Sequence, residues 1–418
     1  MADDSVESAV DKYLESEAAL AAGYISAARR KLLIIILMAI ATVAIALFSL
    51  TVNNCGLNVI EVLDLIFAHL GGATYDIYTP EWFNDVYIWG NSLPRMLFTV
   101  LAAVGLAVAG ASMQSMMNNP LADPYTVGVS SGACLGLAVA VVVGLSVSYG
   151  DTVAILMVSF LFSLLPLAAI VIFAPKTRAS PSTLILAGVA LSYLFNSFNT
   201  LILATVESET LSKIYIWQTG TLGSISWENL PIAFIFILAG SLVILYLARQ
   251  LNLLSLGDAS ASSLGVDPDN LRIICLVAIA FIVGAIVGCA GVIGFVGLVT
   301  PHIVRMLLGS DNRYVIPASA LLATIMMLMA DIVCRALSEY DNIPIGAILS
   351  LIGAPIFLYL IMRRHSYVWR RGRCLRLQAA QAFTDSGRRY RGFGGHRAVF
   401  DFRYFVPHIA AGGLGSRH

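Results

Sequence analysis

Very few side chains in this sequence could do chemistry, and they do not form a recognisable catalytic or metal-binding set. The chain has six Cys and six His, and no two Cys form a C-x-x-C pair. His302 is the one His inside a long apolar stretch, where a single imidazole is more often a packed residue than a ligand. The patterns G-x-x-x-x-G-K-[ST] and H-E-x-x-H are absent. We therefore expect no catalytic residue, no metal site and no cofactor held by this chain.

Charged residues inside the apolar stretches are rare, which makes them informative. Arg95 lies at the start of one stretch, and Arg305 lies near the end of another. Asp331 and Arg335 are four residues apart, so on a helix they would share one face and could pair. A chain of Asp, Glu and His at mid-depth, which a proton-coupled carrier would need, is not apparent.

The apolar stretches themselves predict an all-α integral membrane protein. Of the 418 residues, 58% are hydrophobic and only 12% are charged, and the mean hydropathy is +0.84. Soluble domains carry roughly 25% charged residues, and a membrane-spanning helix needs about 20 apolar residues. The sequence predicts ten transmembrane helices: 32–52, 93–117, 127–149, 152–174, 184–206, 230–248, 272–291, 293–308, 314–337 and 343–362. The first run is too long, and begins too late, for a signal peptide.

The distribution of Lys and Arg predicts the orientation of these helices. Basic residues precede the first run and follow the even-numbered runs, whereas the segment 53–93 carries acids and neither Lys nor Arg. Because cytoplasmic loops are enriched in Lys and Arg, we expect both termini in the cytoplasm. We divide the chain into a cytoplasmic N-terminal arm (1–31), the membrane domain (32–364) and an Arg/Gly-rich C-terminal extension (365–418). The extension is expected to be disordered, although its arginines could bind anionic lipid headgroups.

Ten helices divide into two halves of five, and a repeat with an odd number of helices must be inverted in the membrane. The stretches "VLAAVGLAVAGASMQSMM" and "AIAFIVGAIVGCAGVIGF" have a similar pattern of small residues, and they occupy corresponding places in the two halves. Inverted repeats are typical of transporters. The same pattern of small residues is also typical of ordinary helix packing in a bilayer.

Two connecting segments are unusual. The stretch "NNPLADPYTVGVSSGA" puts Pro120, Asp123 and Pro124 between two apolar runs, and it predicts a structural bend close to the cytoplasmic side. The loop "RQLNLLSLGDASASSLGVDPDNLR" is the longest internal cytoplasmic segment, and Asp258–Leu264 could form a short helix between Gly257 and Gly265. Its leucines, which include Leu256, favour a surface helix that docks a cytoplasmic partner over a solvated loop.

Five stretches resemble the FecCD-type permease family, which imports iron–siderophore complexes, haem and cobalamin through ABC transporters. They lie in the same order and spacing from Pro94 to about Arg364. They are "NNPLADPYTVGVSSGA", "LGDASASSLGVD", "GVIGFVGLVTPHIVRMLLGSDNRYVIPASAL", "LMADIVCRAL" and "IPIGAILSLIGAPIFLYLI".

The resemblance implies partners and roles for particular residues. It implies a second permease subunit, expected as a homodimer although a heterodimer stays open, and a cytoplasmic ATPase dimer that carries the ATP and Mg. The loop with Leu256, Gly257, Asp258, Leu264 and Gly265 would contact that ATPase. An external binding protein would dock on Arg95 and Arg335. The family sometimes has another Arg where this chain has Ser92, which would weaken this docking charge.

The resemblance also implies a translocation path at the subunit interface. The fifth helix, with Asn196 and Asn199, would line this path together with the tenth, and Ser182 in the preceding loop would belong to the inner gate.

These observations predict the permease subunit of an ABC importer in the cell membrane, with the lipid bilayer and protein subunits as partners and no nucleic acid. An iron–siderophore complex is the first cargo expected from the breadth of the family, followed by cobalamin, haem and molybdate. A stand-alone secondary transporter, or a membrane scaffold without transport, is the alternative from a different class.

Overall fold

A computed structural model describes residues 28–52, 56–145, 151–177, 180–337, 343–360 and 362. The predicted C-terminal extension and most of the predicted N-terminal arm lie outside these ranges. Within them, every regular element is a helix. The chain divides into the units Met1–Phe357 and Leu358–His418, and all packing discussed below falls within the first.

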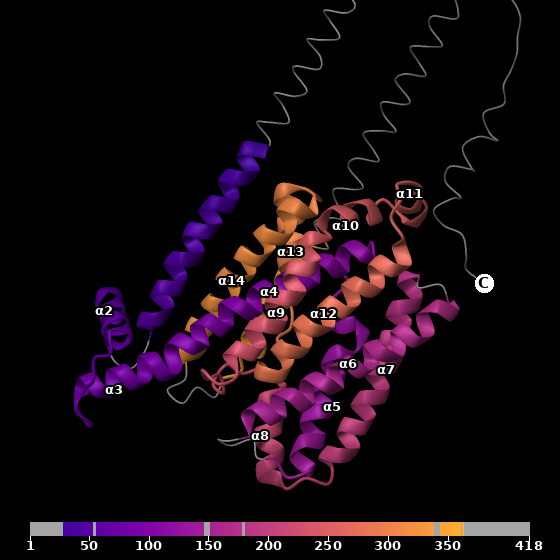
Figure 1. Cartoon of the computed structure of the whole chain (residues 1–418). Coiled ribbons are helices and arrows are strands. Elements are labelled where there is room, and N and C mark those ends of the chain that lie inside the picture. Colours follow the sequence, from indigo (N-terminus) through magenta and orange to yellow (C-terminus); the bar gives the residue numbers. More distant parts are fainter. Residues whose placement is uncertain are drawn as a thin grey trace, which may run out of the picture. The chain divides into compact units, whose positions relative to one another are not determined.

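Each predicted apolar run contains a helix (Figure 1). The helices are Ala28–Thr51, α4 (Leu93–Met116), α5 (Val129–Val142), α6 (Thr152–Thr177), α7 (Pro181–Leu203), α9 (Leu230–Tyr246), α12 (Pro268–Ala290), α13 (Val296–Leu308), α14 (Asn312–Leu337) and Ile345–Leu360. By length and composition, six helices in the described ranges could cross a membrane, or seven with α9 and the bent continuation α10 (Ala248–Leu254). Helices α5, α13 and Ile345–Leu360 are shorter, so the count of ten crossings stays a prediction.

Several helices were not predicted. Segment 53–93 contains α2 (Val59–Leu70), α3 (Pro80–Tyr87) and the π-helical turn η1 (Ile88–Ser92). The run from Pro80 to Met116 is one continuous helix of 37 residues, so the second predicted helix begins earlier than expected. The loop 207–228 contains α8 (Ser208–Gln218). The short helices lack a long apolar run: α3 and α8 mix polar and aromatic residues, and acidic residues interrupt the aliphatic residues of α2.

The starts of several helices follow from local capping. The Asn58 side chain accepts from the Glu61 backbone N–H, and the Glu61 carboxylate accepts from the Asn58 N–H, which makes a capping box at α2. Helices α7 and α12 each have a proline at their first position, after the capping side chains of Ser180 and Asp267. The sequence therefore sets these boundaries without tertiary contacts.

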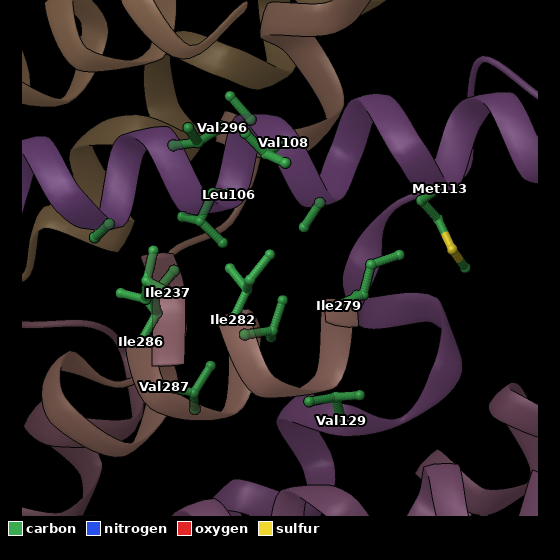
Figure 2. Close-up of a cluster of buried hydrophobic side chains, with 14 of the residues drawn as sticks. Leu106, Val108, Met113, Val129, Ile237, Ile279, Ile282, Ile286, Val287 and Val296 are labelled. Carbon is green, nitrogen blue, oxygen red and sulfur yellow. The ribbon is translucent and has the colours of Figure 1, made fainter. Parts of the chain in front are cut away.

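Helices α4 and α12 form the centre of the packed unit. In the most apolar stretch of each, 72% of α4 residues and 78% of α12 residues are buried, against 6% for both Ala28–Thr51 and α7. Figure 2 shows Leu106 of α4 pointing toward Ile237 of α9 and Ile282 of α12. The two sparsely buried helices expose apolar side chains, as expected for surfaces that meet lipid or another subunit.

The two halves exchange packing partners around this centre, so that the central helix of each half packs against helices of the other half. Helix α4 packs against α13 and α14 of the second half, and α12 packs against α5 and α6 of the first half. In each half, a long central helix is followed by a break in the α-helical backbone and then by a short helix, α5 or α13. This exchange is the pattern that two internal repeats would give.

The contact between α4 and α13 requires glycine. A Cβ atom added at Gly110 would overlap the backbone carbonyl of Gly297, and one added at Gly297 would approach the Leu106 carbonyl oxygen. Because backbone cannot move aside as a flexible side chain can, these two helices approach more closely than any other residue type would allow.

We predict that Gly110→Ala destabilises the protein by about 1–3 kcal/mol, the usual cost of overpacking a tight contact. The measurement is the midpoint of thermal denaturation in detergent. Gly90→Ala is the matched control, because an added Cβ there meets no atom within 4 Å. Equal midpoints for the two variants would contradict the close approach.

Candidate functional site

The predicted short helix in the long cytoplasmic loop is present as α11 (Asp258–Ser263). Gly257 precedes it with φ 103°, and Gly265 follows it with φ 82°, conformations that favour glycine. The Val266 N–H donates to the Ala261 carbonyl and the Gly265 N–H donates to the Ser262 carbonyl, which is a Schellman ending. The two glycines therefore define both ends of α11.

The surface of α11 is apolar at both ends. The Leu256 and Leu264 side chains, which flank the helix, are 64% and 58% exposed. By contrast, Ala261 and Leu254 are buried and hold the loop against the rest of the protein. Two exposed leucines beside a short helix leave an apolar surface that a partner protein could cover.

The α10–α11 region is fastened to the end of α4 by hydrogen bonds. Asn118, just past the end of α4, donates to the Leu254 carbonyl at 3.2 Å. Arg272 in the first turns of α12 is fully buried and pairs with Asp258 at 2.6 Å. Charge patterning identified Arg272 only as a loop charge that indicates orientation, and it could not show that Arg272 is buried.

A second polar network joins α4, α10, α13 and α14 near the same end. Arg305 of α13 donates to Ser115 Oγ of α4 at 2.7 Å and to Asn312 Oδ1 of α14 at 3.0 Å. The Asn252 side chain of α10 donates to Asp311 at 2.8 Å. Hydrogen bonding from the Arg313 guanidinium lowers the pKa of Asp311 to about 2, against the opposing effect of partial burial. Asp311 therefore stays ionised at neutral pH.

The predicted bend after α4 is a compact turn. Asp123 caps the 3-10 helix η2 (Pro124–Val127): its carboxylate accepts from the Tyr125 N–H at 2.9 Å. Pro120 lies in the turn and is partly exposed, whereas Pro124 is buried. The turn then enters α5 through Gly128, with φ 86°.

Tyr125 connects this bend to the corresponding break between α12 and α13. Its hydroxyl donates to the Ile293 carbonyl at 3.1 Å and accepts from the Ile293 N–H at 3.3 Å. One side chain thus satisfies two backbone groups that no helix satisfies.

The following residues Gly128–Gly132 match the hydrolase pattern G-x-S-x-G, but they follow η2 and not a strand, so the strand–turn–helix context of that motif is missing.

The two arginines expected to dock a binding protein are buried in one ion-pair cluster. Arg95 Nε lies 2.8 Å from Asp331 Oδ1, and Arg335 Nη2 lies 2.9 Å from Asp331 Oδ2, so the predicted pairing of Asp331 with Arg335 is confirmed. Arg335 also donates to Ser49 Oγ at 2.6 Å and to the Val52 carbonyl at 2.8 Å. The cluster joins α4 and α14 to the end of helix Ala28–Thr51.

The residues expected to line a path all lie on α7. Ser182, predicted in the preceding loop, is in the first turn of α7, because the Ser180 cap and Pro181 start the helix earlier than its apolar run. Ser182 and Asn196 are exposed. Asn199 is buried, and its side-chain oxygen accepts from Gln218 of α8 at 3.3 Å. The exposed surface of α7 is otherwise mainly apolar, with Leu186 and Tyr193 each more than 70% exposed.

Sequence reasoning missed a contact between α2 and α3. His69 Nδ1 lies 2.8 Å from Asp85, and the His69 ring stacks on Trp89 with 4.1 Å between centroids. Trp227, before α9, donates from its indole N–H to the Trp89 carbonyl at 2.8 Å. Sixteen residues separate His69 from Asp85, so no local spacing would have indicated the pair.

Comparisons with known proteins agree on one family. Residues 23–363 match the profile of the FecCD transport family. The hemin transport system permease protein HmuU of Yersinia pestis is 36% identical over 285 residues, which cover 67% of this chain and 85% of that protein. The vitamin B12 import system permease protein BtuC of Vibrio cholerae is 35% identical over 281 residues, covering 66% and 83%.

A solved structure has the same fold. It is the structure of a transporter assigned to the metal-chelate type of ABC transporters, in an inward-facing conformation. Its TM-score is 0.68 at 31% sequence identity, and the match covers 79% of this chain and 99% of that one.

We predict that Asp331→Asn destabilises the protein by about 3–5 kcal/mol, because it leaves two buried guanidinium groups without their carboxylate. Thermal denaturation in detergent measures this change. The control is Glu209→Gln, which removes an exposed pair with Lys213 at 2.9 Å and should leave the midpoint unchanged. Similar midpoints for the two variants would show that the buried cluster is not a structural joint.

Proposed function

We propose that this chain carries a bulky metal chelate inward, with an iron–siderophore complex as the first candidate. The chain belongs to the FecCD transport family and is the membrane permease subunit of an ABC importer. It is a multi-pass protein of the inner or plasma membrane and a transport subunit, not an enzyme. The observation that carries the proposal is the match in fold and sequence to a transporter assigned to the metal-chelate type, together with the family profile over residues 23–363.

The proposed assembly contains two permease subunits, a cytoplasmic ATPase dimer that holds ATP and Mg, and an external binding protein. ABC permeases of this kind work with an ATPase and a binding protein. Leu256 and Leu264 are the proposed ATPase contacts, because burying them would remove two exposed leucines from water. The sparsely buried surface of α7 is the proposed boundary of the path, formed with a second subunit.

The proposed transport step begins at α11. Motion of the ATPases displaces α11, and the polar contacts around α10, α4 and α12 carry this displacement into the central helices. Asn196 and Ser182 then line the path and its inner gate. A path with many apolar and few charged side chains suits a large chelate better than a bare ion, which would need charged or carbonyl ligands.

Arg95 and Arg335 remain the proposed docking residues for the binding protein, with one condition. Asp331 holds both guanidinium groups, so a carboxylate of the binding protein would have to compete with Asp331 for them. Docking and the separation of α14 from α4 would then be linked events.

Cobalamin is the second candidate cargo, because relatives named as vitamin B12 import permeases match this chain about as well as the hemin permease does. Haem and an oxyanion such as molybdate are further candidates. Uptake into proteoliposomes that contain the permease, its cognate ATPase and binding protein separates them.

The expected result is ATP-dependent uptake of a labelled ferric siderophore, with cobalamin, haem and molybdate offered in parallel. Uptake of one of the other compounds alone would overturn the siderophore proposal. If a complex shown to be intact took up none of them, the proposal of a metal-chelate cargo would be wrong.

We predict that Leu256→Ser with Leu264→Ser weakens binding of the ATPase to the permease by about tenfold or more, since burial of one leucine contributes about 1.5–3 kcal/mol. Affinity for the ATPase in nanodiscs is the measurement. Leu70→Ser on α2 is the matched control, because Leu70 is 65% exposed but lies far along the chain from α11. Unchanged affinity in the double variant would remove α11 from the interface.

A further inference from the structure

Arg272 is a fully buried guanidinium at the junction of three helices. It belongs to the first turns of α12, and its relative exposure is zero. Its Nη1 donates to Asp258 Oδ2 at 3.0 Å and its Nη2 donates to Asp258 Oδ1 at 2.6 Å. This is the paired arrangement in which an arginine fork holds both oxygens of one carboxylate, which fixes direction as well as distance.

The same guanidinium reaches the end of α4. Arg272 Nε donates to the Met116 carbonyl at 3.3 Å, and Met116 is the last residue of α4. Carbonyl groups in the last turn of a helix have no partner within that helix. Arg272 therefore fills this need and, at the same time, links α12 to α4.

Asp258 is the partner that ties α11 into this junction. It is the first residue of α11, next to Gly257, and half of its side chain is exposed. A second carboxylate, Asp269, lies 3.8 Å from Arg272 but is on α12 itself, so it adds charge without adding a link. The Asp258 fork is the charged contact that holds α11 to α12 in the described part of the chain.

We infer that Arg272 is the positioning residue that transmits movement of α11 to α4 and α12. The inference rests on the proposed function, because it assumes that a partner ATPase moves α11. A buried cation needs its carboxylate, so α11 cannot move away from α12 without a large electrostatic cost. The three elements must then move together, and α4 leads directly into the bend that contains Pro120.

The test uses Arg272→Lys, which keeps the positive charge but loses the fork that holds both Asp258 oxygens. The full complex is reconstituted in proteoliposomes, and uptake, ATP hydrolysis and ATPase affinity are measured together. We expect unchanged ATPase affinity and continued hydrolysis, with uptake per ATP hydrolysed about tenfold lower, the loss expected from one charge-assisted hydrogen bond. Arg249→Lys is the control, because Arg249 is exposed in the same region.

Asp258→Asn completes a double-mutant cycle. If the fork carries the movement, the two changes together lower uptake per ATP no further than Arg272→Lys alone. Independent losses that multiply would mean that Asp258 and Arg272 act separately, and would overturn the inference. A wild-type ratio in Arg272→Lys would overturn it as well.

A distance measurement needs no cargo, so it separates this inference from the proposed function. It also tests the inference if the Arg272→Lys variant assembles poorly with its partners. Spin labels at Ser262→Cys on α11 and Leu121→Cys beyond α4, both exposed positions, report the separation of the two elements. We expect one narrow distance in the wild-type background and a broad distribution with Arg272→Lys. Equal widths would overturn the inference, whereas absent uptake by the wild type would count only against the proposed cargo.

Discussion

The fold depends on one constraint: where the chain leaves a helix inside an apolar protein, the freed backbone N–H and C=O groups must find hydrogen-bond partners within the protein. Two such breaks in the helices follow α4 and α12. These two breaks face each other, and the Tyr125 hydroxyl bonds both backbone groups of Ile293. Once the breaks are joined, α4 and α13 must approach closely, and Gly110 and Gly297 leave the room for this approach. The exchanged packing of the two halves follows from that contact.

In the described part of the chain, three clusters of largely buried charge each connect several helices. Asp331 brings together arginines from α4 and α14, Arg272 connects α11, α12 and α4, and Arg305 connects α13 with α4 and α14. Apolar attraction has no direction of its own, whereas a paired charge fixes the register of the two elements that it joins. A transporter needs both properties, because its helices must move as units and keep their alignment while they move.

The sequence predicted the features that follow from local pattern. Every apolar run contains a helix, and α11 lies between its two predicted glycines. Features that need distant contacts were missed. Arg95 and Asp331 are far apart in the sequence, so no local pattern indicates that they pair. Arg272 resembles a loop charge until its burial is known. Helices α2, α3 and α8 were missed because none contains a long apolar run: α3 and α8 mix polar and aromatic residues, and charged residues interrupt the aliphatic ones of α2. Partner contacts and cargo depend on other molecules, so they remain proposals.

The central claim is that α11 is the surface through which an ATPase acts on this permease. A photo-reactive label attached at Ser262→Cys on α11 tests it directly, with a label at Ser224→Cys, beyond α8, as the comparison. In membranes that contain the cognate ATPase, we predict a cross-link from position 262 to the ATPase that changes when ATP is added, and none from position 224. A cross-link from position 224 alone would place the ATPase at the other end of the helices and contradict both the orientation and the role of α11.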